Sequence, residues 1–174
     1  MKIPTTFAAV ALLLTVFSAA CGDDEQEVLT PTLSPTETPP ASAQIDFDTF
    51  LVGGNSGVMI EEPSIFKIET QEAWAELWST HVSVVVPTPT SPDVAFDDKM
   101  LIAVFDREQS TGGFAIQVQS IVVDESGIVV EVLRTVPGRG CAVTQALTQP
   151  FHMVLADAAD GDVQLALTDQ ALDC

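Results

Sequence analysis

The sequence contains no tyrosine, two histidines, three cysteines, and only six lysines and arginines against 25 aspartates and glutamates. A formal net charge of -19 excludes the basic patch that binds DNA or RNA, and an anionic membrane surface would repel the chain. The two histidines have no His or Cys beside them at ligand spacing, so we expect no metal site and no other cofactor.

Hydrophobic residues are abundant, at 47% of 174 residues. A chain of this length and hydropathy can bury enough apolar surface for one folded domain, whereas two domains would each be small.

The N-terminus has the pattern of an export signal. Residues 7–20 are apolar or small, and a run of that length is shorter than the roughly 20 residues that span a bilayer as a helix. The ending Ser18-Ala19-Ala20-Cys21 resembles the bacterial lipobox, although Ser18 stands where an aliphatic residue is usual. We therefore predict a lipoprotein signal peptide over residues 1–20, lipidation of Cys21, and a lipid-anchored protein of the bacterial cell envelope that faces the extracytoplasmic side.

A Pro-, Thr- and acid-rich stretch follows over residues 21–43. It has no aromatic residue and cannot build a core, so we expect a disordered, self-repelling tether. The folded domain is predicted over residues 44–174.

If Cys21 is acylated, Cys141 and Cys174 remain as a pair in an oxidising compartment, and this arrangement predicts a disulfide between them. Two free thiols, or a reactive Cys141 activated by the nearby Arg134 and Arg139, are the alternatives.

The fold class expected is mainly β (α+β), an antiparallel sheet or sandwich with one packed helix at about residues 70–82. The helix has Thr70 as its cap and an apolar stripe at three- and four-residue spacings. Residues 100–105 form a continuous apolar run, which predicts a strand buried on both faces. Further strands are predicted over residues 65–69, 114–119, 128–136, 151–155 and 163–167.

Two finer features of the sheet are also predicted. The alternation of apolar residues changes phase near Ser120, which indicates a bulge. An acidic turn over residues 157–162 predicts that residues 151–155 pair with residues 163–167 as a hairpin.

The sequence has few candidate catalytic residues. Ser56 lacks the glycine two residues later that a nucleophile elbow needs, because Val58 stands there. His81 and His152 are more readily explained as packing residues. A hydrolase acting through Ser56 or Cys141 is a minor alternative, and we expect that the protein is not an enzyme.

One loop, Ser110-Thr111-Gly112-Gly113-Phe114, is unusual because paired glycines lead into an aromatic residue at an exposed edge. Together with residues 74–78, 100–105 and 144–152, it resembles the PrcB C-terminal domain family over about residues 53–167. That family is named after a subunit of a bacterial surface protease complex. The resemblance implies an exported bacterial protein and no defined catalysis. Thr111, Gly112 and Gly113 match the Thr-Gly-Gly-aromatic signature of that family, with Phe114 where tyrosine is common.

The same loop is similar to the Thr-Thr-Gly-aromatic loop of chagasin-like cysteine protease inhibitors. We therefore expect a non-enzymatic interaction or accessory lipoprotein, associated with an exported protein partner such as a protease, as a complex subunit or an inhibitor. The alternative is a small-ligand carrier or sensor with a pocket lined by Trp74 and Trp78.

Overall fold

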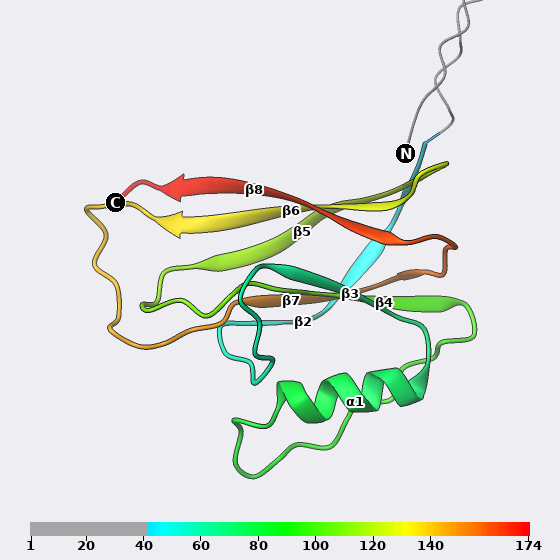
Figure 1. Ribbon diagram of the computed structural model, residues 1–174, viewed down its shortest axis with the longest axis horizontal. Coiled ribbons are helices and arrows are strands. Elements are labelled where there is room, and N and C mark those ends of the chain that lie inside the picture. Colours follow the sequence, from blue (N-terminus) through cyan, green and yellow to red (C-terminus); the bar gives the residue numbers. More distant parts are fainter. Residues whose placement is uncertain (1–41) are drawn as a thin grey trace, which may run out of the picture. The chain divides into compact units, whose positions relative to one another are not determined.

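Eight strands and one helix follow one another in residues 42–174, the part of the chain that the computed structural model describes (Figure 1). The elements are β1 (Ala43–Ile45), β2 (Phe47–Gly53), β3 (Ser64–Ile68), α1 (Gln71–His81), β4 (Lys99–Phe105), β5 (Ala115–Asp124), β6 (Gly127–Pro137), β7 (Phe151–Asp157) and β8 (Val163–Leu172).

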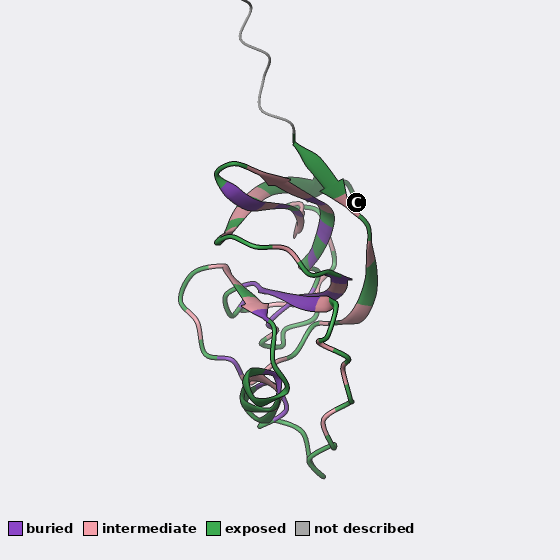
Figure 2. Ribbon diagram, turned by 90° about the vertical axis from the view of Figure 1, so that its right-hand side faces the viewer, coloured by how far each residue is buried: buried purple, intermediate pink, exposed green. Residues whose placement is uncertain are grey.

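The strands form two four-stranded sheets. One sheet has the order β1-β5-β6-β8 and the other has the order β2-β7-β4-β3. All neighbouring strands are antiparallel except β6 and β8, which run parallel. The two sheets stack with α1 on the outer face of the second, as Figure 2 shows in end view. The predicted mainly β fold with one packed helix is confirmed.

Strand β4 is buried on both faces because its sheet lies between the other sheet and the helix. Met100, Ile102 and Val104 belong to the core between the two sheets, whereas Leu101 and Phe105 belong to the core under the helix. All five side chains are fully buried. The apolar run in the sequence therefore reflects a strand with no solvent-facing side.

Helix α1 begins and packs as the sequence predicts. The side chain of its N-cap, Thr70, accepts a hydrogen bond from the Ala73 amide at 3.2 Å. Trp74 is fully buried against the sheet, and its indole Nε1 donates to the Pro92 carbonyl at 2.9 Å. In the part of the chain that the structure describes, no helix is long and apolar enough to cross a membrane.

The prediction that residues 151–155 and 163–167 form a hairpin is wrong. β7 pairs with β2 and β4 in one sheet, whereas β8 crosses to the other sheet and pairs with β6. Their burial patterns give the physical reason. Most of β7 is buried, as in a central strand, whereas β8 alternates between half-buried and exposed residues over 163–167 and is exposed over 168–172, as in an edge strand. The segment between them is a corner between sheets.

The predicted bulge in β5 is confirmed, because the β5–β6 register shifts between Val118 and Ser120. His152 of β7 accepts a hydrogen bond at Nδ1 from the Val118 amide, at 2.9 Å, and its Nε2 lies 3.0 Å from the Thr49 hydroxyl. This imidazole thus links the two sheets at the bulge.

Strands β1 and β2 were not predicted, and β2 contains a register shift of its own between Thr49 and Leu51.

Candidate functional site

Four chain segments meet at the end of the sandwich where β4 and β6 finish (Figure 1). They contain Gly54 and Gly57, His81, Gln109, and Thr148 and Gln149. Backbone hydrogen bonds join them: Gln109 and Thr148 form an isolated bridge, the Gln149 amide donates to Gly54, and the Gly57 amide donates to His81. Residues far apart in the sequence are therefore held in one surface.

The Thr-Gly-Gly-aromatic loop is a packing element of this end. Gly112 is buried, and its amide donates to the Thr144 carbonyl at 2.9 Å. A Cβ atom at position 112 would clash with the Thr144 hydroxyl, so any larger residue would force the Thr144 side chain to shift. Gly113 has a φ of +92°, in the region that favours glycine. Thr111 accepts at its carbonyl from the Thr148 hydroxyl at 2.9 Å.

The five residues of the predicted interaction loop differ in exposure. Ser110 and Gly113 are exposed, Thr111 and Phe114 are half-buried, and Gly112 is buried. Through the hydrogen bonds of Gly112 and Thr111, the loop supports the segment that contains Thr144 and Thr148.

The supported segment borders two adjoining hollows of about 550 and 540 Å³. Ser56, Val84, Glu108 and Gln149 line both. Large apolar side chains stand exposed around them, with exposed fractions of 97% for Met59, 93% for Val86, 63% for Leu147 and 61% for Val84. We call Met59, Val84, Val86, Leu147 and Glu108 the loop-end surface.

No motif in the sequence identifies these apolar residues as a site. Their clustering depends on contacts between segments far apart in the chain. The one local signal is the run Val84-Val85-Val86 between the helix and a proline, where an exposed loop would ordinarily be polar.

Ser56 and His81 lie next to each other, with 2.9 Å between Ser56 Oγ and His81 Nδ1. Burial lowers the pKa of His81, which favours the neutral imidazole. The same Ser56 oxygen accepts from the Val58 amide at 3.2 Å. A triad would need a carboxylate to orient the imidazole, and within residues 42–174 His81 has no hydrogen bond to one. The pair fastens the loop after β2 to the end of α1.

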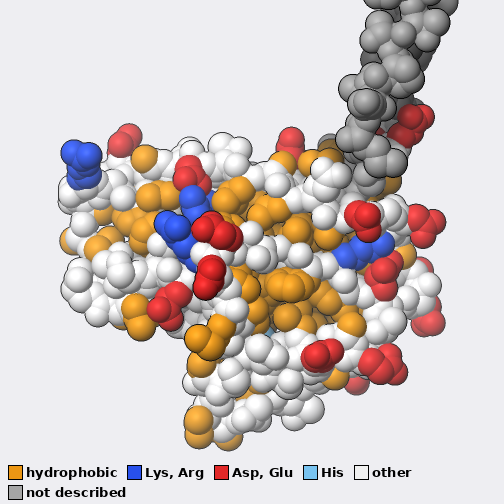
Figure 3. Space-filling view, in the orientation of Figure 1, with side chains coloured by type: hydrophobic (Ala, Val, Ile, Leu, Met, Phe, Trp, Pro, Cys, Tyr) orange, Lys and Arg blue, Asp and Glu red, His pale blue; other side chains and the backbone are white. Residues whose placement is uncertain are grey.

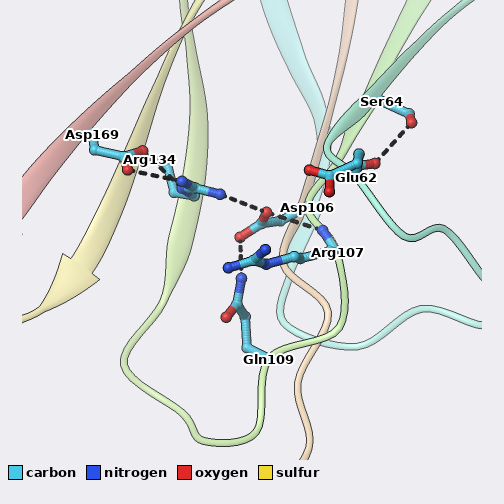
Figure 4. Close-up of polar contacts among 7 residues, drawn as sticks. All are labelled: Glu62, Ser64, Asp106, Arg107, Gln109, Arg134 and Asp169. Atoms are coloured by element: carbon cyan, nitrogen blue, oxygen red, sulfur yellow. Dashed lines mark hydrogen bonds and ion pairs between the residues drawn. The ribbon is translucent and has the colours of Figure 1, made fainter.

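An ion network that is buried at one end and exposed at the other lies beside the loop-end surface (Figure 4). The Asp106 side chain is fully buried and accepts from Arg134 Nη1 at 3.2 Å and from Gln109 Nε2 at 2.9 Å. Arg134 also donates a bidentate pair of hydrogen bonds to the Asp169 carboxylate, each 2.8 Å long. The guanidinium lowers the pKa of Asp169. The network ties the end of β4 to β6 and β8.

A disulfide joins Cys141 and Cys174, whose Cα atoms are 5.1 Å apart. It agrees with the predicted pairing and leaves no reactive thiol at Cys141. It fastens the end of the chain to the loop that follows β6.

The predicted signal peptide, the lipidation site Cys21 and most of the predicted tether lie outside the described residues. In residues 42–174, no group of three or more His, Cys, Asp or Glu is placed to hold a metal ion.

The fold and its loop end define a small β-sandwich with an apolar, glycine-supported surface at one end. Residues 100–155 match the PrcB C-terminal family. The matched segment runs from β4 into β7 and includes the Thr-Gly-Gly-aromatic loop, so the resemblance predicted from the sequence is confirmed there. No curated protein and no solved structure shows significant similarity to the chain.

Proposed function

We propose that the protein is a membrane-anchored extracytoplasmic lipoprotein that acts as a non-enzymatic accessory module. Its partner is an exported protease, or another subunit of a protease complex, that docks on the loop-end surface. The exposed apolar cluster around the two hollows is the observation that carries this proposal.

An exposed cluster of this kind needs an explanation, because soluble domains rarely expose several large apolar side chains together. Leu147 and Val84 border the same hollow, and Glu108 supplies one carboxylate within it. This arrangement suits a partner that inserts an apolar side chain and places a positive charge near Glu108.

The family match supports the choice of partner, since the resemblance implies a protease-complex subunit. The burial of Gly112 favours a subunit over an inhibitor. An inhibitory loop must project into a protease cleft, whereas Gly112 packs against Thr144.

The proposed location rests on the sequence pattern that ends at Cys21 and on the disulfide. Disulfides persist in extracytoplasmic compartments and are rare in the cytosol. We propose that lipid on Cys21 holds the domain at the membrane and that the tether gives it reach.

The alternative of a small-ligand carrier gains no specific support. Trp74 is fully buried, and the Trp78 indole Nε1 donates to the Pro89 carbonyl at 3.0 Å. The two rings lie 5.3 Å apart between centroids. Their packing under the loop over residues 87–92 explains both indoles as structural groups.

The test is crosslinking in native cells with the full chain, followed by affinity purification and mass spectrometry of the membrane fraction. Leu147→Glu should leave the fold intact, because the side chain is exposed, and should reduce recovery of the protease or protease subunit at least about tenfold. Val52→Glu is the matched control, because Val52 is 60% exposed and lines neither hollow.

Equal recovery with Leu147→Glu and with wild type would overturn the docking surface. A Cys21→Ala strain tests the anchor, since it should release the protein from the membrane fraction. Recovery of the anchored chain alone would favour the carrier.

A further inference from the structure

A second surface lies at the edge of the sheet that carries the helix. β3 is the last strand of the order β2-β7-β4-β3, and it pairs with β4 on one side only. In an antiparallel pair every second residue points its N–H and C=O groups away from the partner strand. Among the described residues, no hydrogen bond from another strand satisfies this outer edge of β3.

A groove of about 340 Å³ runs between this edge and the helix. Phe66 and Ile68 of β3 form one wall, and Ala73 and Leu77 of α1 form the other. Phe66 is 37% exposed, which is high for a side chain that also packs edge-on against Phe105, with 5.9 Å between ring centroids. In Figure 3, apolar side chains gather over this part of the molecule.

Strand β8 of the other sheet lies near β3 but does not pair with it, and the lysine of β3 protects this edge only weakly. A lysine on an edge strand ordinarily discourages pairing, because pairing would bury its charge. Here the Lys67 side chain is only 14% exposed, its Nζ lies 3.0 Å from Glu69 Oε1, and it donates to the Gly161 carbonyl at 3.2 Å. Its charge is thus neutralised by Glu69, and its ammonium group is held by the Gly161 carbonyl. Strand β2, at the other edge of the same sheet, is interrupted by a register shift.

The surroundings of the groove are strongly acidic. Lys67 is the only lysine or arginine among the residues that line the groove, and it is already paired. Exposed carboxylates precede β3, follow it and stand on the facing helix. They belong to Glu61, Glu62, Glu69, Glu72 and Glu76.

We propose that β3 and the groove beside it bind an extended segment of a partner polypeptide, which adds to the sheet as a further strand. Backbone hydrogen bonds to β3 hold the segment, and its alternate apolar side chains fill the groove. Lysines or arginines at its ends face the acidic border. A second copy of this chain is a poor occupant, because its own net charge of -19 would be repelled.

The experiment uses the full chain and a library of decapeptides. The library has random residues at alternate central positions, threonine between them, and either Lys-Arg or Glu-Glu at both ends. The protein should select apolar residues at the random positions and only in the Lys-Arg series. The dissociation constant of the best peptide should rise at least about threefold between low and physiological salt.

Two variants locate the binding. Ala73→Phe fills the groove from an exposed helix position and should weaken the best peptide at least about tenfold. Ala75→Phe is the matched control, because Ala75 is exposed on the same helix and does not line the groove. Bound peptide should also slow hydrogen exchange of the backbone amides of residues 64–68.

Several results would overturn the proposal: no selection from either series, selection in the Glu-Glu series, equal weakening by Ala73→Phe and Ala75→Phe, or no added protection of β3. Self-association that Ala73→Phe abolishes would assign the edge to a second copy and would also overturn it. Since Leu147 lies outside the groove, Leu147→Glu should leave peptide binding unchanged, so this test is independent of the protease-docking test.

Discussion

His152 offers a sharp test of how the two sheets are held together. Its imidazole is 2% exposed, and its Nδ1 accepts the hydrogen bond of the Val118 amide at 2.9 Å. An amide can only donate, so Nδ1 carries no proton, and Nε2–H donates to the Thr49 hydroxyl at 3.0 Å. The neutral ring is therefore the form that the fold requires.

Replacing His152 by phenylalanine keeps a ring of similar size and removes both hydrogen bonds. The Val118 amide, left buried without an acceptor, costs about 1–3 kcal/mol, and the lost contact with Thr49 adds about 0.5–1 kcal/mol. We expect His152→Phe to lower the free energy of unfolding by about 1.5–4 kcal/mol at neutral pH. Thr49→Val, which spares the Val118 contact, should cost less.

The destabilisation should depend on pH in a definite direction. Burial lowers the pKa of His152 below its usual 6.5, so the unfolded chain binds the proton more readily than the folded chain. The contribution of His152 is therefore complete above about pH 6.5 and is lost as the pH falls below that value towards the folded-state pKa. His81, whose pKa burial also lowers, is present in both proteins, so its effect largely cancels in the comparison.

Urea unfolding followed by tryptophan fluorescence measures both effects, because Trp74 and Trp78 are the only tryptophans and both lie on α1. The gap between wild type and His152→Phe should be largest near about pH 7.5 and should narrow by about pH 5.5. A gap under about 0.5 kcal/mol at neutral pH, or one that widens with acid, would refute the reasoning.

Two further predictions concern the loop end, and urea unfolding checks both. Gly112→Ala should destabilise the protein by about 1–3 kcal/mol, because the added methyl group clashes with the Thr144 hydroxyl, and the penalty should shrink in a Thr144→Ala background. Arg134→Met should cost about 3–5 kcal/mol, because it leaves the fully buried Asp106 carboxylate without its cation, and adding Asp106→Asn should recover part of the loss.

The sequence predicts the helix and the central strand well because their signals are local. Thr70 caps the helix by accepting a hydrogen bond from the amide three residues later, and the apolar stripe repeats with the helical period. The run over residues 100–105 needs no partner to be recognised as a strand buried on both faces.

The errors arise where pairing is not local. A turn between two strands suggests a hairpin, but β8 runs parallel to β6, and only the arrangement of the two sheets determines that choice. β2 escaped prediction because its register shift between Thr49 and Leu51 breaks the alternation that marks a strand.

The candidate site was predictable in part. The glycine pair marks residues 110–114 in the sequence, but no local pattern marks the apolar residues that it supports. Leu147 and Val86 are hydrophobic, and a hydrophobic residue in a sequence is ordinarily expected in the core. Their exposure becomes visible only once residues 84–86 and 147–149 meet around one hollow.

The structure also changes how the Thr-Gly-Gly signature should be understood. A glycine that allows a close approach acts through the segment it admits, so Gly112 determines where Thr144 lies, and Thr111 helps to fix Thr148 beside Leu147. Substitution of Gly112 should therefore impair partner binding and stability together, whereas substitution of Leu147 should impair partner binding alone. That difference separates the residues that build the surface from those that a partner would touch, and it makes Leu147 the decisive position for testing function.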